Sequence, residues 1–206
     1  MVTIHTYGDS HASHHGGWND IKHENIKINI NHIEGKLAFS FGRDKTHVVN
    51  NVNSGDVVIF CFGEIDCRCH INKYEPDWKE SIDALVQSYV ENVHRNVMHI
   101  DGLTTCVYNV VPPLERENPL NLWTEVWANE SGVPATGTDE DRKKYTEYMN
   151  LKIKEYCEKY SFIFFDVYEK YSDENGFLKR ELSDTNCHIK DPIYIEEFIL
   201  KNIKND

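Results

Sequence analysis

A serine near the start of the sequence and a histidine near its end are candidates for nucleophilic chemistry. Ser10 closes the segment 7–10 (YGDS), which follows a short apolar run, and His188 closes the polar segment 182–188 (LSDTNCH), with Asp184 four positions ahead of it. A serine hydroxyl becomes an effective nucleophile when a base takes its proton and a third group orients that base. Each segment alone also has a structural explanation, because the serine turn could cap a helix and the histidine could be a cap or surface residue.

A third polar segment, 63–70 (GEIDCRCH), directly follows the most hydrophobic run of the chain. It holds four ionisable side chains: Glu64, Asp66, Arg68 and His70. So many ionisable groups beside a buried strand end are unusual for a plain loop, and they make all four residues candidates for oxyanion or substrate binding. The structural alternative is an ion-pair network, Asp66–Arg68 or Glu64–Arg68, that holds the turn.

The cysteines and the other histidines do not predict a metal site. The chain has six cysteines and no CxxC pair, which favours reduced thiols. A cluster can be drawn from Cys61, Cys67, Cys69 and His70. However, one residue separates Cys67 from Cys69, whereas zinc sites usually space paired cysteines by about two to four residues. The segment 11–15 (HASHH) lacks an acidic partner at a fixed spacing, so we predict a protein that works without a metal or an organic cofactor.

The pattern of apolar residues predicts alternating strands and helices. Continuous apolar runs closed by polar or turn residues predict buried strands at 2–7, 57–62, 104–111 and 161–167. Apolar residues at helical spacing predict helices at 77–98, 139–160 and 192–203. This alternation implies a mostly parallel sheet that is covered on both faces. We predict a single domain, residues 1–206, with a three-layer α/β/α sandwich of the flavodoxin-like kind.

The predicted fold brings remote segments together. In open α/β sheets, ligands bind beyond the carboxyl ends of the strands. Segments 8–10 and 63–68 each follow a predicted strand directly, so both are expected at that edge.

The order and the positions of the three segments resemble the SGNH (GDSL-like) hydrolase family, in which a GDS block opens the chain and an Asp-x-x-His block closes it. The resemblance spans residues 5–190, which is nearly the whole chain. It implies that Ser10 is the nucleophile, that His188 is the base that later protonates the leaving group, and that Asp184 orients His188. It also implies that Gly42, in the run FSFGR, is the second-block glycine whose N–H joins that of Ser10 in the oxyanion hole.

Two positions depart from the family pattern. Ile65 stands where the third block, Gly-x-Asn-Asp, has the asparagine that donates to the oxyanion, and an apolar side chain cannot make that hydrogen bond. Arg68 or His70 could supply a substitute donor. An extra residue between Asp184 and His188 changes how the carboxylate meets the imidazole, so a Ser–His dyad, or a backbone carbonyl in place of the acid, stays open.

The chain starts with the GDSH variant, which resembles SGNH domains linked to carbohydrate O-acylation and O-deacylation, and its His11 either lines the site or packs beside it. We therefore predict a serine esterase that cleaves an O-acyl group from a carbohydrate through an acyl-serine intermediate. Trp123 and Trp127 lie in the long segment 112–138, which has room for a short helix at 120–129, and could stack on a sugar or pack in the core. The alternatives are an O-acyltransferase with the same serine and histidine, and a carbohydrate-binding module that has lost turnover.

The composition argues against several classes of partner. The net charge of −12 is spread along the chain and opposes general binding to nucleic acid or to an anionic membrane. No apolar run approaches the roughly 20 residues needed to cross a bilayer, and the first residues (MVTIHTYGDS) lack the layout of a secretory signal. We expect a soluble, cytoplasmic protein that acts on a small-molecule or glycan ester; the sequence does not fix its oligomeric state.

Overall fold

The computed structural model describes residues 2–116 and 135–203. Its centre is a five-stranded sheet in the order β2-β1-β3-β4-β5, in which every neighbouring pair is parallel. The strands are β1 (Val2–Gly8), β2 (Ile26–His32), β3 (Val57–Cys61), β4 (Thr104–Tyr108) and β5 (Ile163–Phe165). The helix predicted at 120–129, with Trp123 and Trp127, lies outside the described residues.

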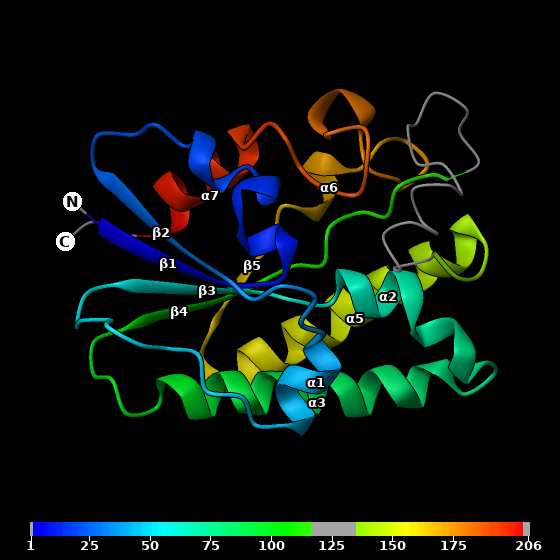
Figure 1. Ribbon diagram of the computed structural model, residues 1–206, viewed down its shortest axis with the longest axis horizontal. Coiled ribbons are helices and arrows are strands. Elements are labelled where there is room, and N and C mark those ends of the chain that lie inside the picture. Colours follow the sequence, from blue (N-terminus) through cyan, green and yellow to red (C-terminus); the bar gives the residue numbers. More distant parts are fainter. Residues whose placement is uncertain (1, 117–134, 204–206) are drawn as a thin grey trace.

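Helices lie on both faces of the sheet, which confirms the predicted α/β/α architecture. Figure 1 shows α1 (Ala38–Arg43), α3 (Trp78–Val97) and α5 (Asp139–Tyr160) on one side of the strands, and α7 (Ile193–Asn202) on the other. The shorter helix α2 (Glu64–Cys69) directly follows β3, and α6 (Tyr168–Tyr171) follows β5. In the part of the chain that the structure describes, no helix is both long enough and apolar enough to span a membrane.

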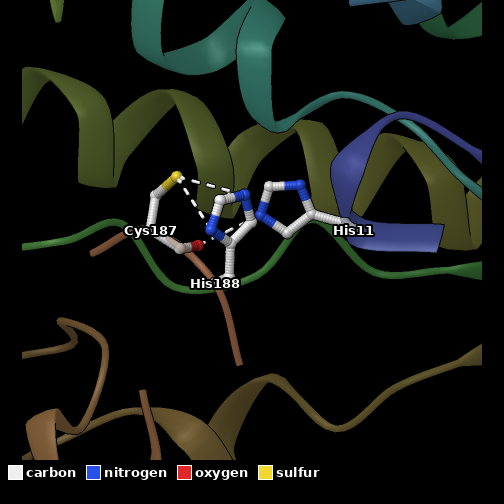
Figure 2. A group of neighbouring side chains, drawn as sticks. All are labelled: His11, Cys187 and His188. Carbon is white, nitrogen blue, oxygen red and sulfur yellow. Dashed lines mark hydrogen bonds between the residues drawn. The ribbon is translucent and has the colours of Figure 1, made fainter. Parts of the chain in front are cut away.

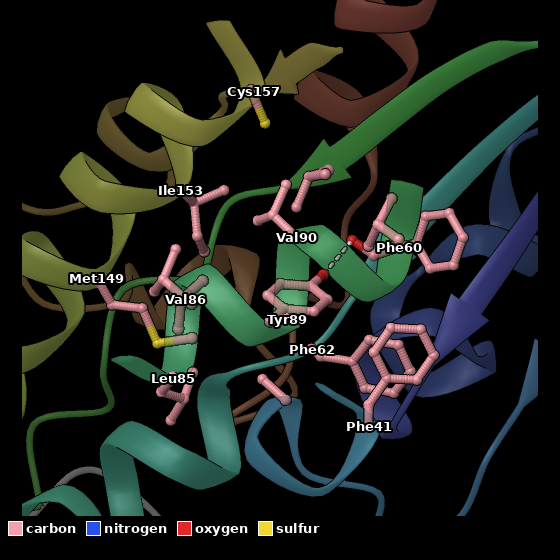
Figure 3. Close-up of a cluster of buried hydrophobic side chains, with 14 of the residues drawn as sticks. Phe41, Phe60, Phe62, Leu85, Val86, Tyr89, Val90, Met149, Ile153 and Cys157 are labelled. Carbon is pink, nitrogen blue, oxygen red and sulfur yellow. Dashed lines mark hydrogen bonds between the residues drawn. The ribbon is translucent and has the colours of Figure 1, made fainter. Parts of the chain in front are cut away.

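Alternate residues of β3 belong to two separate cores. Val58 and Phe60 pack in the cluster that α1, α3 and α5 cover, whereas Val57 and Ile59 pack in the cluster on the α7 side. Successive side chains of a strand point to opposite faces, so a central strand covered on both faces must be apolar throughout. Figure 3 shows the first core, where the Tyr89 hydroxyl of α3 donates to the carbonyl oxygen of Phe60 at 3.3 Å.

The start of α5 has a local cause in the sequence. The side chain of Thr138 accepts the N–H of Asp141 at 3.1 Å, and the side chain of Asp141 accepts the N–H of Thr138 at 2.9 Å. This reciprocal capping box satisfies N–H groups that have no partner within the helix. It begins α5 at the position where the sequence predicts a helix.

The segment between β1 and β3 differs from the sequence prediction. β2 is an edge strand whose partly buried isoleucines alternate with lysine and asparagine. This alternation is typical of a half-buried strand, and the prediction, based on continuous apolar runs, misses it. The aromatic run 39–41, which looks strand-like, forms part of α1. The reason is tertiary: Phe41 is fully buried and contacts Tyr89 of α3 edge-to-face, with ring centroids 5.9 Å apart.

Candidate active site

The turn after β1 places Ser10 beyond the carboxyl end of the strand. A Cβ at Gly8, the last residue of β1, would overlap the carbonyl oxygen of Cys61 at the end of β3, so a glycine is required for the two strand ends to approach. Ser10 then opens a short 3-10 helix, Ser10–Ala12, whose N-cap is Asp9. The serine is half-buried at this junction.

A tight loop between Ser183 and Ile189 presents His188. An antiparallel bridge joins the two ends of the loop, and the N–H of Asp184 donates to the carbonyl oxygen of His188 at 3.0 Å. Thr185 has a left-handed φ of 65°, which gives the chain the turn it needs to fit the extra residue between Asp184 and His188. Asp184 and His188 therefore lie in one loop whose ends are joined by backbone hydrogen bonds.

Ser10, His188 and Asp184 form a continuous hydrogen-bonded chain. The His188 Nε2 lies 2.9 Å from the Ser10 Oγ, and its Nδ1 lies 2.9 Å from the Asp184 Oδ2. Because an ionised carboxylate can only accept, we assign the ring proton to Nδ1, which leaves Nε2 to accept the serine proton. Burial alone would raise the pKa of Asp184, but the hydrogen bond from the His188 ring and those from the backbone N–H groups of Asn186 and His188 hold this pKa below its ordinary value.

Asp66 caps a helix, and this placement corrects its assignment as an oxyanion or substrate ligand. Its Oδ2 accepts the N–H of Ala38 at 2.8 Å, and its Oδ1 accepts the N–H of Phe39 at 3.2 Å, in the first turn of α1. Burial raises the pKa of Asp66 to about 7, although the two N–H groups favour its carboxylate form. The side chain thus ties α2 to α1.

Glu64 and Arg68 pair across one turn of α2. The Arg68 Nε donates to the Glu64 Oε1 at 2.6 Å, and the two side chains are 11% and 9% exposed, respectively. Burial alone would raise the pKa of Glu64 and lower the pKa of Arg68. The attraction between their opposite charges outweighs burial, so the pKa of Glu64 is lowered and the pKa of Arg68 is raised. The structure thus contains the Glu64–Arg68 ion pair that the sequence offers as the structural alternative.

Replacing Arg68 with alanine is expected to destabilise the fold more than it slows the chemistry. The variant leaves the buried Glu64 carboxylate unpaired, which costs about 3–5 kcal/mol and lowers the melting temperature by roughly 6–20 °C. Calorimetry and kcat per folded molecule, measured on one preparation, check this. Adding Glu64→Gln should recover much of the lost stability. An unchanged melting temperature with kcat lowered about 100-fold would instead assign Arg68 to the oxyanion.

Gly42 and His70 lie away from the hydrogen-bonded chain. Gly42 is inside α1, where a Cβ would lie 2.6 Å from the Ser88 side chain of α3, so this glycine permits close helix packing. Its assignment as the second-block glycine is corrected, because Gly42 lies inside α1 and not at a strand end. His70 follows α2 and lines a cavity of about 450 Å³ that is formed largely by α1, α3 and the short 3-10 helix Ile71–Tyr74. Among the described contacts, none joins either residue to Ser10 or His188.

Two histidines of the segment 11–15 flank the ring of His188. The His11 and His188 ring centroids are 4.9 Å apart, and His15 stacks on His188 at 5.2 Å with an interplanar angle of 28°. Burial and the neighbouring rings of His14 and His188 lower the pKa of His15. Sequence reasoning treats His14 and His15 only as metal-ligand candidates and misses this stacking. Their short distance from Ser10 along the chain is the one signal that could have indicated it.

Figure 2 shows the neighbouring side chains of His11, Cys187 and His188. Their potential metal-ligand atoms lie within 4.8 Å of one another. Both nitrogens of each ring already have partners: those of His11 face Asp9 and the carbonyl oxygen of Cys187, each at 3.0 Å. Burial raises the pKa of the Cys187 thiol well above its ordinary value, which disfavours the thiolate that binds metals. A metal here would have to break the hydrogen bonds of His188, so we assign none to this cluster.

The fold matches solved structures of lipolytic proteins and esterases. A Streptococcus pneumonia protein provisionally described as a platelet activating factor aligns with a TM-score of 0.64 and 16% identity, over 98% of this chain and 84% of that one. A member of the lipolytic G-D-S-L family from Veillonella parvula aligns with a TM-score of 0.57 and 12% identity, over 98% of both chains. An acetylxylan esterase from Geobacillus stearothermophilus aligns with a TM-score of 0.56 and 12% identity, over 100% of this chain and 95% of that one.

No protein-family model and no curated protein matches the sequence. At the identities of the solved structures, the likeness establishes the fold alone. It confirms the GDSL-like architecture that the order of the sequence blocks predicts.

Proposed function

We propose that this chain, whose fold is that of the SGNH/GDSL hydrolases, is a serine esterase. Ser10 is the nucleophile, His188 is its base, and Asp184 orients the base. The observation that carries this proposal is the chain of two 2.9 Å contacts that runs from Asp184 through His188 to Ser10. These groups come from remote segments and meet in the order that acyl transfer requires.

The reaction follows from this geometry in two stages. The Ser10 Oγ attacks the carbonyl carbon of the ester while the His188 Nε2 takes the hydroxyl proton. As the acyl-serine forms, the bond to the alcohol breaks, and the His188 imidazolium returns the proton to the departing oxygen. A water molecule then attacks the acyl-serine with the same base and releases the acid. Asp184 remains ionised throughout and keeps Nδ1 protonated.

The oxyanion needs donors at the start of the serine turn. The N–H of Ser10 opens a 3-10 helix, and the first N–H groups of a helix have no partner within it, so this N–H is the first donor that we assign. Ile65 supplies no side-chain donor. Glu64, which borders the site, is held by Arg68, and this pairing offsets the charge that the carboxylate would otherwise present to the oxyanion.

We place the substrate among O-acylated sugars or glycans with a short acyl group. The GDSH start of the chain supports the carbohydrate part, as does the acetylxylan esterase among the structures with this fold. The same acetylxylan esterase supports a short acyl group.

A panel of esters tests this function. The purified protein should hydrolyse p-nitrophenyl acetate at least about ten times faster than the octanoate ester, because the proposed substrate carries a short acyl group. It should also release acetate from acetylated xylan, and a Ser10→Ala sample should release none above background. A free sugar added as acceptor separates hydrolysis from acyl transfer. If no ester is cleaved while acetylated xylan still binds, the protein is a binding module and the esterase proposal fails.

A further inference from the structure

His11 connects the turn of the nucleophile to the loop of the base. It lies in the 3-10 helix that Ser10 opens, and it is 5% exposed. Its Nδ1 lies 3.0 Å from the Asp9 Oδ1, and its Nε2 lies 3.0 Å from the carbonyl oxygen of Cys187. Cys187 directly precedes His188, and Figure 2 shows the contact between its carbonyl oxygen and the ring of His11.

Both atoms that face the His11 ring are acceptors, so both ring nitrogens must donate. A carbonyl oxygen has no proton to give, which places a proton on Nε2. The Asp9 Oδ1 accepts the backbone N–H of His11 at 2.9 Å, as a carboxylate oxygen does. Because this same oxygen faces Nδ1, we place the proton between Nδ1 and Asp9 on the ring. His11 is therefore an imidazolium.

The charges around His11 favour the protonated ring. Burial alone would lower the pKa of His11, but the charge and the hydrogen bond of Asp9, the charge of Glu64 on α2 and the Cys187 carbonyl raise it to about 9. Asp9 is fully buried, and Glu64 is 7% exposed, so little solvent screens these charges. Two titratable groups face His11 from the base loop: the ring of His188, with its centroid 4.9 Å away, and the Cys187 thiol, whose sulfur lies within 4.8 Å of a ring nitrogen of His11.

We propose that His11 is a positioning residue, whose imidazolium bridges the Ser10 turn and the 183–189 loop and so sets the distance between Ser10 and His188. This inference rests on the proposed function. The two reacting groups are 178 positions apart in the sequence, and the bridge joins their segments one residue away from each group. A displacement of about 1 Å between nucleophile and base costs on the order of 100-fold in rate. A buried bridge that fixes the distance between Ser10 and His188 therefore affects the rate of turnover.

Two substitutions separate the two arms of the bridge. His11→Asn keeps a nitrogen at the Nδ1 position, which still donates to Asp9, but it loses the arm that reaches Cys187. His11→Gln keeps a nitrogen at the Nε2 position, which still donates to Cys187, but it loses the arm to Asp9. We expect His11→Asn to label with a fluorophosphonate, and to hydrolyse p-nitrophenyl acetate, about 100-fold more slowly than the wild type. We expect His11→Gln to remain within about tenfold of the wild type.

The matched controls are His99→Asn and His99→Gln, because His99 is exposed and follows α3. Both should label at the wild-type rate. Circular dichroism and melting temperatures show whether each variant is folded, and rates are expressed per folded molecule. Equal losses in the two His11 variants, or a larger loss in His11→Gln, would overturn the bridge to the base loop.

Nitrogen NMR of the histidine rings tests the imidazolium without any turnover. At pH 7.5 both ring nitrogens of His11 should carry protons, and the ring should titrate near pH 9. Since this pKa lies above the ordinary 6.5, the bridge contributes its full stability below about pH 6.5 and loses it as the pH rises through about 9. A neutral His11 ring at pH 7.5 would overturn the proposal. If wild-type Ser10 does not label at all, the esterase function fails, while the NMR result still decides the state of His11.

Discussion

Ser10→Ala is expected to lower kcat/KM for ester hydrolysis by at least about 10⁴-fold, because no acyl-enzyme can form without the hydroxyl. The half-buried side chain loses one hydroxyl and its contact with His188, so the melting temperature should change little. Initial rates on p-nitrophenyl acetate and a calorimetric scan measure both quantities. Ser54→Ala, at an exposed position, is the matched control and should keep wild-type activity. Substantial hydrolysis by a folded Ser10→Ala protein would remove Ser10 from the mechanism.

Asp184→Asn should lower kcat by roughly 10³- to 10⁴-fold through the tautomer of His188. The Asp184 Oδ1 accepts the N–H groups of Asn186 and His188, at 2.8 and 3.2 Å, while its Oδ2 faces the His188 Nδ1. An asparagine must keep its oxygen toward the two backbone N–H groups, so its NH₂ group faces the ring. The Nδ1 then has to accept, and the proton moves to Nε2, where it points at Ser10 and blocks the base.

The pH dependence of kcat and the rate of Ser10 labelling measure this effect. Asp184→Ala provides the comparison, because it removes the orienting acid without imposing the wrong tautomer and should retain more activity than Asp184→Asn. A loss of less than about tenfold in Asp184→Asn would show that Ser10 and His188 work as a dyad.

The sequence predicts the parts of the fold that depend on continuous local patterns. The apolar run of β3 and the helical spacing of apolar residues in α3 each match the element that forms. Both patterns consist of residues that the hydrophobic core buries. Ser10, His188 and Asp184 are predictable for a different reason. A serine after a strand and a histidine near an acid are typical of nucleophilic catalysis, and the order of the three blocks along the chain resembles that of the SGNH family.

The remaining features depend on tertiary contacts that leave no local signal. The run 39–41 has the composition of a strand but packs as a helix on α3, which moves Gly42 away from any strand end. Asp66 belongs to a segment rich in ionisable groups, yet its partners are backbone N–H groups of α1, 28 and 27 positions away. The contact between His11 and Cys187 spans 176 positions and involves a backbone carbonyl, which no pattern of side chains can indicate.

Covalent labelling tests directly whether His188 activates Ser10 as a nucleophile. Wild-type protein and His188→Ala are treated with a fluorophosphonate beside an unrelated serine esterase, and the adduct is located by peptide mass spectrometry. We expect one adduct on wild-type Ser10 and a labelling rate at least about 1000-fold lower in His188→Ala. Absence of the adduct from the wild type while the reference esterase reacts, or equal labelling of the two proteins, would contradict this activation.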